Sequence, residues 1–391
     1  MKKEKLTQKE VLSRQVAEIL PTKKGLEEVM KKRKIRLYLG IDPTGANLHL
    51  GHTIALRKLQ QFADLGHEAI LVVGTGTVLA GDPSQRDSAR PKITRGEIVK
   101  NMKSWKDQAA KILDFSKIKM KYNGDWLLKL KLADIFDIAS NISAIQLFQR
   151  DMFQRRISNK DTVWMHETLY PLLQGYDSVV LNVDLEIGGT DQVFNMLIGR
   201  ELQRKMKGKE KFVLTVPMIV GLNGKTMSKT SGNTVNITDS PKEMYGKLMT
   251  IQDELVPQYF ELCTDVPEIE VVKLKKELSP RDFKACLSRE IVALYHGAKK
   301  AKVAEKEFVR VFQKKQLPSH IQKIKTSHLA PLPLYKAVAN LFSISGSAAR
   351  RVIEQGGVKV DGATQKNPSL VLKLRSGMII QVGKRRTLQI A

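Results

Sequence analysis

Two histidines three residues apart are the first side chains whose types and spacing suit chemistry on a phosphate. They are His49 and His52, in the segment LHLGH, with Gly51 between them. Side chains at i and i+3 share one face of a helix, and a glycine there lets a flat base come close to the backbone. A helix N-terminus also attracts anions. Alone, such a pair is more often part of a polar helix surface, so further segments must decide.

A second candidate segment is NGKTMSKT, residues 223–230, a glycine-containing polar loop that follows an apolar run. Its lysines, serine and threonines are mobile donors suited to a triphosphate. A flexible loop of this kind can close on the charge that develops during phosphoryl or nucleotidyl transfer. Taken alone, solvated loop lysines are the more common explanation.

Polar side chains also interrupt an apolar stretch at Tyr170, Gln174 and Asp177. Positions i, i+4 and i+7 lie on one face of a helix. Burying these groups without partners would be costly, and a zwitterionic amino acid would supply partners. The alternative is a polar stripe that faces water.

Apolar runs indicate the strands that must position these groups. They are IRLYLGID (35–42), HEAILVVGTG (67–76), DSVVLNVDLEIGGTDQ (177–192) and KFVLTVPMIVGL (211–222), with a helix expected over about 48–65. Near-continuous hydrophobic strands alternating with helices are typical of a parallel sheet covered on both faces. We therefore predict an α/β fold, a doubly wound parallel sheet. In such a sheet, ligands bind at the carboxyl ends of the strands.

The rest of the chain divides by composition. Residues 1–34 read as a basic amphipathic helical lead-in, and a helical insertion is expected near 100–165. We predict a catalytic domain over 1–240, an all-α domain over 241–325 and, after the linker HLAPLPL, a small α+β domain over 331–391.

The formal net charge of +26 attracts polyanions, of which nucleic acid is the commonest, although a generally basic surface is the alternative. The two cysteines, Cys263 and Cys286, do not have the spacing of a disulfide framework or a zinc site. No stretch approaches the roughly 20 apolar residues of a membrane span, and the N-terminus does not resemble a secretory signal. We expect a cytoplasmic protein without a membrane partner.

HLGH and TMSKT together resemble the HIGH and KMSKS signatures of class I aminoacyl-tRNA synthetases. Lys229 is in register with the second lysine of KMSKS, but Thr226 stands where the first is expected and Lys225 lies one residue earlier. Three further segments resemble the tyrosyl-tRNA synthetases, in the same order along essentially the whole chain. They are YLGIDPT (38–44), YPLLQGYD (170–177) and IGGTDQ (187–192).

The resemblance implies a Rossmann-like catalytic domain that joins L-tyrosine to ATP and then to tRNA(Tyr). It assigns catalysis to His49, His52, Lys229 and Lys225, with Lys225 a candidate substitute for the missing lysine. It assigns tyrosine binding to Tyr38 and Asp177 at the phenolic hydroxyl, Tyr170, Gln174 and Asp82 at the ammonium group, and Gln192 and Thr77 nearby. It assigns ATP binding to Gly40, Asp42, Thr44, Gly51, Gly189, Asp191, Met227, Ser228 and Lys229.

The same resemblance implies that the substrate carboxylate attacks the α-phosphate directly, without a protein nucleophile. Magnesium would arrive with ATP as a co-substrate rather than in a protein cage, and neither zinc nor NAD is expected. One departure lies beside Thr77. The family commonly has a glycine at the next position, where this chain has Val78.

Residues 345–362, SGSAARRVIEQGGVKVDG, resemble a small RNA-binding domain first seen in a ribosomal small-subunit protein and found at the end of many bacterial tyrosyl-tRNA synthetases. Arg350 and Arg351 on a helix and Lys359 on a strand would bind phosphates, together with the run Lys384, Arg385 and Arg386. By the resemblance, the helical domain contacts the anticodon side of tRNA, and the helical insertion forms a homodimer contact.

Three alternatives remain. A tryptophanyl-tRNA synthetase is the nearest relative, but Tyr38 and Asp177 favour a phenol over an indole. A synthetase-derived RNA-binding protein without ligase activity is conceivable because of Thr226. A nicotinamide oxidoreductase would need the GxGxxG fingerprint, and the glycines over 73–82 are mis-spaced for it.

Overall fold

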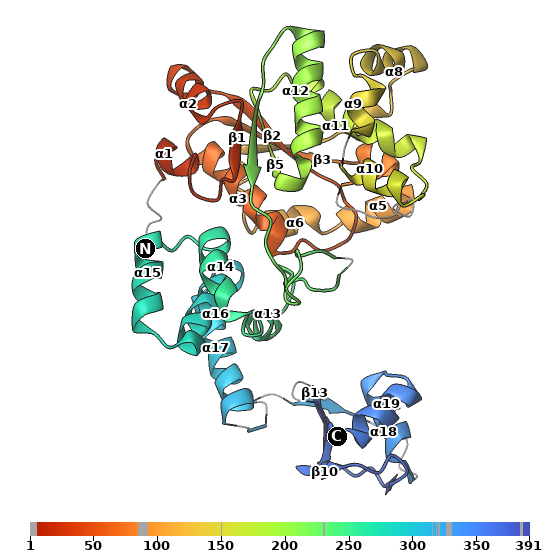
Figure 1. Ribbon diagram of the computed structural model, residues 1–391. Helices are drawn as coiled ribbons and strands as arrows, with labels where there is room; N and C mark the ends of the chain where they lie inside the picture. The colour runs from red at the N-terminus through yellow and green to blue at the C-terminus, as the bar shows by residue number, and fades with distance from the viewer. Residues whose placement is uncertain are drawn as a thin grey trace. The chain divides into compact units, whose positions relative to one another are not determined.

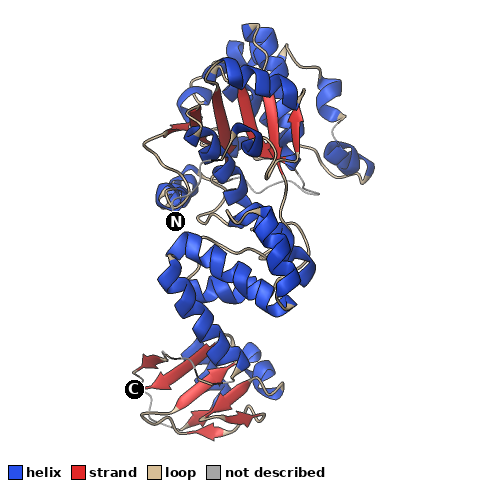
Figure 2. Cartoon of the chain, turned by 90° about the vertical axis from the view of Figure 1, so that its left-hand side faces the viewer, coloured by secondary structure: helices blue, strands red, loops and turns tan. Residues whose placement is uncertain are grey.

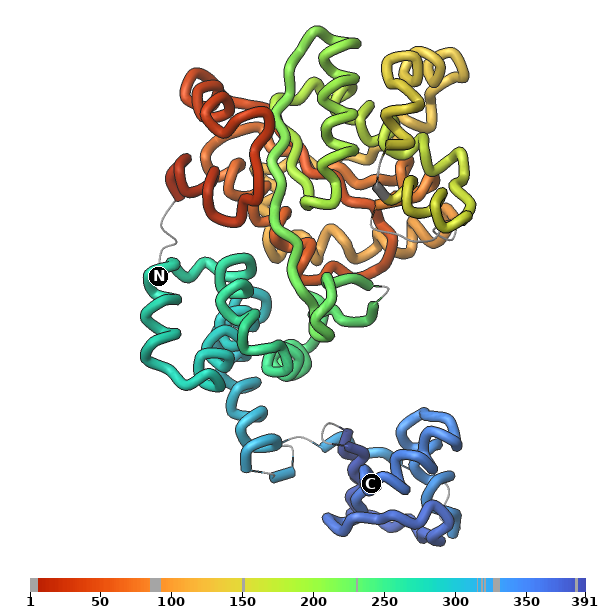
Figure 3. Tube along the Cα trace, in the orientation of Figure 1, coloured from red at the N-terminus to blue at the C-terminus, as the bar shows by residue number. Residues whose placement is uncertain are grey.

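The computed structural model describes residues 6–84, 93–149, 151–229, 231–314, 316–317, 319, 321–325, 331–383 and 386–391 (Figure 1). The chain forms two compact units, Met1–Ala298 and Lys299–Ala391. Within the larger unit the chain trace folds back repeatedly, so that segments distant in sequence become neighbours (Figure 3). The expected division into domains at 240 and 325 remains a prediction.

A six-stranded sheet, counted over the described residues, forms the centre of the larger unit, in the order β1-β6-β5-β2-β3-β4 (Figure 2). All neighbouring pairs are parallel except β1 and β6. Five of the six residues of β3 are buried, as expected for a strand covered on both faces. The predicted doubly wound parallel sheet is confirmed. The strands are β1 Glu18–Leu20, β2 Arg36–Ile41, β3 Glu68–Val73, β4 Ile118–Tyr122, β5 Leu185–Gly189 and β6 Phe212–Val216.

Helices cover both faces of this sheet (Figure 2). The three longest helices that carry site residues are α3 (Leu50–Asp64), α11 (Met165–Leu181) and α12 (Val193–Lys207). Helices α11 and α12 cross at Gly175 and Gly199, where a Cβ on Gly175 would lie 3.0 Å from the Gly199 Cα atom. Two glycines at the crossing let the backbones approach closely, so α11 packs directly against α12.

The remaining helices of this unit are either short or lie in the helical segment that follows β6. Pro241–Leu248 and Pro280–His296 both begin with a serine cap followed by proline, which is the pattern that favours helix initiation. The full set is α1 Gln8–Val11, α2 Lys23–Lys32, α4 Thr77–Ala80, α5 Arg95–Met102, α6 Trp105–Ala109, α7 Gly124–Leu127, α8 Leu132–Ala139, α9 Ala144–Phe148, α10 Asp151–Ser158, η1 Thr190–Gln192, α13 Pro241–Leu248, η2 Asp253–Leu255, α14 Val256–Cys263, α15 Glu268–Glu277 and α16 Pro280–His296.

Three described strands lie where the sequence predicted only helix. One is β7, Gln322–Ile324, which lies at the end of the expected all-α segment and joins the sheet of the smaller unit. β1 falls inside the expected helical lead-in, because its few apolar residues pair antiparallel with the edge of β6. β4 falls inside the expected insertion at 100–165 and pairs parallel with β3. Its sequence, IKMKY, alternates apolar and lysine side chains, and its burial alternates as well. An edge strand of this kind lacks the continuous apolar run that revealed the central strands.

The smaller unit contains the small α+β fold expected over 331–391, but it begins earlier, at Lys299. Its five-stranded sheet has the order β10-β9-β12-β13-β7, and β11 pairs with β8. Buried side chains from both helices and the sheet, including Leu334, Ile353 and Ile380, form one core. The elements are α17 Ala298–Phe308 (all but its first residue in this unit), the π turn η3 Val309–Gln313, β7 Gln322–Ile324, β8 Leu332–Pro333, α18 Leu334–Phe342, α19 Gly346–Glu354, β9 Val358–Val360, β10 Ala363–Gln365, β11 Val371–Leu372, β12 Ile379–Val382 and β13 Arg386–Ile390.

Candidate functional site

A cavity of about 1060 Å³ opens at the carboxyl ends of β2, β3, β5 and β6. This is the edge at which a parallel sheet presents its loops to a ligand. The predicted site residues that line it are Gly40, Asp42, Thr44, His49, Gly51, His52, Thr77, Asp82, Tyr170, Gln174, Asp177, Gly189, Asp191, Gln192, Lys225, Met227, Ser228 and Lys229. Tyr38 is the one predicted tyrosine or ATP contact outside this lining.

The two histidines meet at the beginning of α3. His49 caps the helix, its backbone N–H donates to Nδ1 of His52 at 3.1 Å, and the two rings are 3.8 Å apart. Burial, and then the nearby charge of Lys229, lowers the pKa of His49 to about 3. Burial also holds the pKa of His52 well below its usual value. Both imidazoles are therefore neutral at pH 7.

One polar atom of this pair is left without a protein partner. Nδ1 of His49 is buried and makes no hydrogen bond within the described residues. A buried polar atom without a partner is costly, so its presence in a cavity wall points to a ligand. Gly51 leaves space beside this imidazole, because a Cβ there would lie only 3.0 Å from the His49 ring.

The lysine-containing loop lies between β6 and α13 and lines the same cavity. It is folded back on itself: the Met227 N–H donates to the Ile219 carbonyl at 2.9 Å, and the Ser228 N–H donates to Oδ1 of Asn233 at 2.9 Å. Lys229 is half-buried, whereas Lys225 is exposed. Thr230 lies outside the described residues. Both lysines considered from the sequence are therefore at the cavity.

Asp42 joins three segments at the end of β2. Its two carboxylate oxygens accept hydrogen bonds from the Thr77 hydroxyl at 2.7 Å and the Tyr170 hydroxyl at 3.0 Å. Gly74 makes room for it, because a Cβ on that residue would fall 1.8 Å from Asp42 Oδ1. The departure from the family at Val78 is accommodated inside the protein. Its side chain is buried, while Thr77 faces Asp42.

A chain of hydrogen bonds runs along one wall of the cavity. Gln192 donates to Asp82 at 2.9 Å and accepts from Asn195 at 2.8 Å. Asn195 also donates to the side-chain oxygen of Gln174 at 3.1 Å, and Gln174 in turn donates to Glu186 at 3.1 Å. The orientation of each amide is set by the next one along the wall.

Asp177 lies at the inner end of this wall with only 2% of its surface exposed. Asn123 donates to one carboxylate oxygen at 3.0 Å and the Trp126 indole donates to the other at 2.8 Å. Burial raises the pKa of Asp177 to about 8 in spite of these donors. The spacing argument for α11 is confirmed as geometry, since Tyr170, Gln174 and Asp177 all face the cavity.

Tyr38 lies behind the wall rather than on its surface. It is fully buried, and its hydroxyl is 3.1 Å from the Ser178 hydroxyl and donates weakly to the Gln174 carbonyl at 3.5 Å. Burial raises its pKa well above the usual value, and the nearby carboxylates of Glu186 and Asp177 raise it further. Tyr38 is therefore a neutral neighbour of Asp177.

Several residues of the site were missed from the sequence. Asn123 and Trp126 hold Asp177, and they follow β4, so recognising that strand would have revealed them. Glu186 forms a buried ion pair with Lys211, whose ammonium group also donates to Ser178 at 2.8 Å. The sequence did contain one indication of this pair, because a lysine begins the otherwise apolar run KFVLTV.

In the smaller unit, the predicted RNA contacts Arg350 and Arg351 lie on α19 and Lys359 on β9, and all three are exposed. The Arg350 guanidinium lies 3.7 Å from the centre of the Tyr335 ring. Arg386 is also exposed, whereas Lys384 and Arg385 lie outside the described residues.

Two features are absent from the described part of the chain. No cluster of three or more His, Cys, Asp or Glu side chains is arranged to hold a metal ion. None of the helices there is both long and apolar enough to span a membrane.

Comparison with known proteins identifies the family of the chain. The family described as "tRNA synthetases class I (W and Y)" matches residues 30–313, and the "S4 domain" matches residues 333–380. The tyrosine–tRNA ligase of Thermotoga maritima is 39% identical, with 98% of this chain and 97% of the relative covered. That of Moorella thermoacetica is 40% identical, with 99% and 96% covered.

Solved structures share the fold. The mitochondrial tyrosyl-tRNA synthetase of Aspergillus nidulans superposes with a TM-score of 0.66 at 22% identity, over 76% of this chain and 91% of that one. The tyrosyl-tRNA synthetase of Archaeoglobus fulgidus, complexed with L-tyrosine, gives 0.62 at 21% identity, over 76% and 98%. The chain therefore belongs to the class I aminoacyl-tRNA synthetases, and within them to the tyrosyl-tRNA synthetase family with a C-terminal S4 domain.

Proposed function

We propose that this chain is a tyrosine–tRNA ligase that forms tyrosyl-adenylate from L-tyrosine and ATP and then transfers tyrosine to the 3′ end of tRNA(Tyr). The observation that carries the proposal is the buried Asp177, fixed by Asn123 and Trp126 at the inner end of a cavity that has a histidine pair on another wall. The family to which the chain belongs supports the same reaction.

Tyrosine would lie with its phenol at Asp177 and its ammonium group near Asp82. A phenolic hydroxyl both donates and accepts hydrogen bonds, so it complements Asp177 in either protonation state, with Tyr38 close behind. At the other end, Asp82, Tyr170 and Gln174 offer oxygen atoms to the ammonium group. Gln192 and Thr77 orient these groups through the hydrogen bonds that they make to Asp82 and Asp42.

ATP would occupy the part of the cavity next to α3. Its phosphates suit the unpartnered Nδ1 of His49 and the beginning of the helix. The base would approach the backbone at Gly51 and Gly40, and the ribose would bind Asp191 beside Gly189. Met227 and Ser228 bring the loop to the nucleotide, and Asp42 and Thr44 lie toward the α-phosphate.

The chemistry would need no protein nucleophile. The tyrosine carboxylate attacks the α-phosphorus, a new P–O bond forms, and the bond to the β-phosphate oxygen breaks as pyrophosphate leaves. His49, His52, Lys229 and Lys225 would stabilise the negative charge that develops. Magnesium would be held mainly by the ATP phosphates and would add to this stabilisation.

The smaller unit would bind tRNA through Arg350, Arg351 and Lys359. Each phosphate that a cation neutralises releases counterions, so binding weakens with salt. We expect Arg351→Ala to weaken tRNA(Tyr) binding and to reduce the slope of log affinity against log salt by about one unit. Glu354→Gln, on the same helix, serves as the control and should leave the slope unchanged. An unaltered slope for Arg351→Ala would remove this residue from the interface.

We also propose a cytoplasmic homodimer whose contact lies in the 100–165 segment and the start of α11. Large apolar side chains are exposed there, with Leu132 69%, Phe136 63%, Ile145 71% and Met165 72% accessible. Monomeric proteins rarely expose several large apolar side chains in one region, and such a region usually marks a contact with another protein. Sedimentation of the parent chain and of Phe136→Glu should give a dimer and a monomer respectively. Identical mass for both would argue against this contact.

The decisive assay is exchange of labelled pyrophosphate into ATP with tyrosine, tryptophan and phenylalanine. Only tyrosine should support it. Asp177→Asn should lower kcat/KM for tyrosine by about 5- to 150-fold, since a buried hydrogen-bonding group left without its partner costs about 1–3 kcal/mol. Exchange with none of the three amino acids would favour the RNA-binding alternative. Exchange with tryptophan would favour the tryptophanyl enzyme.

A further inference from the structure

An indole and a backbone carbonyl hold the ammonium group of Lys229. The Nζ atom of Lys229 lies 5.5 Å from the centre of the Trp105 ring, within cation–π range. The same ammonium donates to the Gly45 carbonyl at 3.4 Å, and the Trp105 indole N–H donates to that carbonyl at 3.0 Å. The two side chains therefore converge on one acceptor in the loop after β2.

This loop is also held by other contacts, so the position of the Gly45 carbonyl does not depend on Trp105 alone. Asn101 on α5 donates to the Pro43 carbonyl at 2.9 Å. Gln108 on α6 donates to the Ala46 carbonyl at 2.7 Å and accepts from the Leu48 N–H at 2.8 Å. The loop leads directly into His49, so α5 and α6 fix the segment between β2 and the histidine pair.

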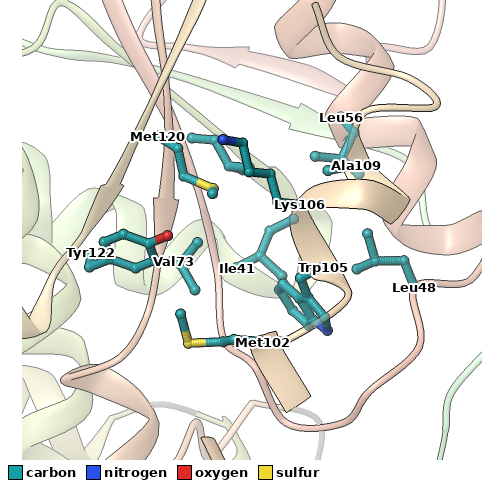
Figure 4. Close-up of a pocket in the computed structure, with 11 residues that line it drawn as sticks. Ile41, Leu48, Leu56, Val73, Met102, Trp105, Lys106, Ala109, Met120 and Tyr122 are labelled. Carbon is teal, nitrogen blue, oxygen red and sulfur yellow. The ribbon is translucent and has the colours of Figure 1, made fainter. Parts of the chain in front are cut away.

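Trp105 itself is only 6% exposed and is seated among apolar side chains. It lines a small cavity of about 40 Å³ together with Ile41, Leu48 and Met102 (Figure 4). The figure shows the indole beside Ile41 and Met102, with its nitrogen turned away from them. A gap this small suits packing adjustment rather than a ligand. The ring is thus anchored in the protein while it contacts a loop lysine.

Space at Gly45 completes the arrangement. A Cβ on Gly45 would lie 3.0 Å from Cδ and 3.2 Å from Nζ of Lys229, so the lysine lies flat against this backbone. Lys229 and Thr44 both line the proposed nucleotide site. The charge of Lys229 is also close enough to the histidines to lower the pKa of both, after burial.

We infer that Trp105 is a positioning residue, which with the Gly45 carbonyl holds Lys229 at the nucleotide site before ATP binds. This inference rests on the proposed function. Holding the ammonium group in place in advance removes the need to order a long side chain when charge develops on the phosphates. A cation over indole is stabilised by about 0.5–2 kcal/mol, which corresponds to about 2- to 30-fold in rate.

The test compares Trp105→Leu and Trp105→Phe in pyrophosphate exchange. Trp105→Leu should lower kcat/KM for ATP about tenfold and leave KM for tyrosine unchanged. Trp105→Phe keeps an aromatic face and should recover most of the activity. Met102→Leu changes the same small cavity without reaching Lys229, and it should match the parent chain.

A double-mutant cycle separates positioning from general damage. In a Lys229→Met background, Trp105→Leu should cause no further loss, because the ring would act through the missing ammonium group. The same fold loss in both backgrounds would overturn the inference, as would a Trp105→Phe variant as impaired as Trp105→Leu. If Trp105→Leu fails to fold, Trp105→Met, which also lacks an aromatic face, takes its place in the cycle.

A second readout does not depend on activity. Reductive ¹³C-methylation keeps the positive charge of each lysine, and the Lys229 signal can be assigned by its loss in Lys229→Arg. Ring current from Trp105 should displace this signal, and the displacement should vanish in Trp105→Leu but not in Met102→Leu. An unshifted signal in the parent chain refutes the contact. A shifted signal in a chain without pyrophosphate exchange refutes the proposed function and leaves the contact intact.

Discussion

The two ends of the cavity differ in how far their polar groups are already bonded. At the inner end, both carboxylate oxygens of Asp177 have donors, and the amide of Gln174 bonds through both its nitrogen and its oxygen. At the end beside α3, Nδ1 of His49 is unpartnered within the described residues, and Lys225 is exposed. Asp177 and Gln174 are thus hydrogen-bonded without substrate, although Oδ1 of Asn195 behind them has no partner within the described residues. The α3 end, by contrast, has donors in reserve.

This difference matches the function proposed for each end, which is recognition of tyrosine at the inner end and stabilisation of phosphate charge beside α3. Recognition of a phenol needs a fixed geometry, and a hydrogen-bonded network surrounding Asp177 supplies it before tyrosine enters. Stabilising charge that appears only in the transition state needs donors that are not already engaged. The two imidazoles are neutral, so the α3 end gains no extra fixed charge from them before ATP arrives.

The largest effect is expected from the inner end, at Lys211. It is fully buried and pairs with Glu186, which is also buried. Lys211→Met would leave Glu186 as an uncompensated charge, and breaking such a pair costs about 3–5 kcal/mol. Urea unfolding should therefore show a loss of this size in the free energy of unfolding.

Lys209→Met is the matched control. Lys209 pairs with Asp184 at 3.0 Å but is 29% exposed, so its loss should cost under about 1 kcal/mol. Adding Glu186→Gln to Lys211→Met should restore part of the stability, since the unpaired charge is then removed. Equal losses for Lys211→Met and Lys209→Met would mean that the inner end is not held by the buried pair.

The next effect is expected from the open end. His52→Ala should lower the rate of tyrosine activation by about 10²–10³-fold, the range for removing one donor to transition-state charge. The dissociation constant for tyrosine should change less than about twofold, because His52 is not part of the hydrogen-bonded wall. Single-turnover activation and equilibrium binding measure the two quantities. His67→Ala, outside the cavity, is the control, and equal losses in rate and affinity would contradict the division between the two ends.

The sequence predicted the side chains that line the cavity better than those that support them, for a physical reason. His49, His52 and the 223–230 loop are contiguous segments, and α11 places Tyr170, Gln174 and Asp177 on one face by helix periodicity alone. The central strands are continuous apolar runs because both of their faces are buried. These are local properties that a reader of the sequence can see.

The supports of the inner end depend on contacts between distant segments. Asn123 and Trp126 reach Asp177 only because β4 pairs with β3, and the lysines of β4 concealed that strand. Lys211 meets Glu186 only through the pairing of β5 with β6 and the glycine crossing of α11 with α12. Likewise, the position of Tyr38 behind the wall follows from tertiary packing, since its place on a strand says only that it is buried.

The most direct contrast is the pH dependence of stability without ligands, in which the expected effect per pH unit is smaller than those above. The pKa of Asp177 is raised from 3.8 to about 8, so between these values the folded chain binds a proton that the unfolded chain has lost. Its contribution to the free energy of unfolding is therefore greatest at low pH and declines as pH rises toward 8. The pKa of His49 is lowered from 6.5 to about 3, so below 6.5 it is the unfolded chain that binds the extra proton. Its contribution declines as pH falls.

The two ends should thus give slopes of opposite sign, each at most about 1.4 kcal/mol per pH unit. Urea unfolding between pH 4 and 8 would measure them as differences between variant and parent, which cancels titration elsewhere in the chain. Asp177→Asn should remove a decline between pH 5 and 8, and His49→Gln should remove a rise between pH 4 and 6. If both substitutions shift the curve by a constant at every pH, neither group titrates as its burial requires. The contrast between a closed inner end and an open nucleotide end would then have to rest on hydrogen bonding alone.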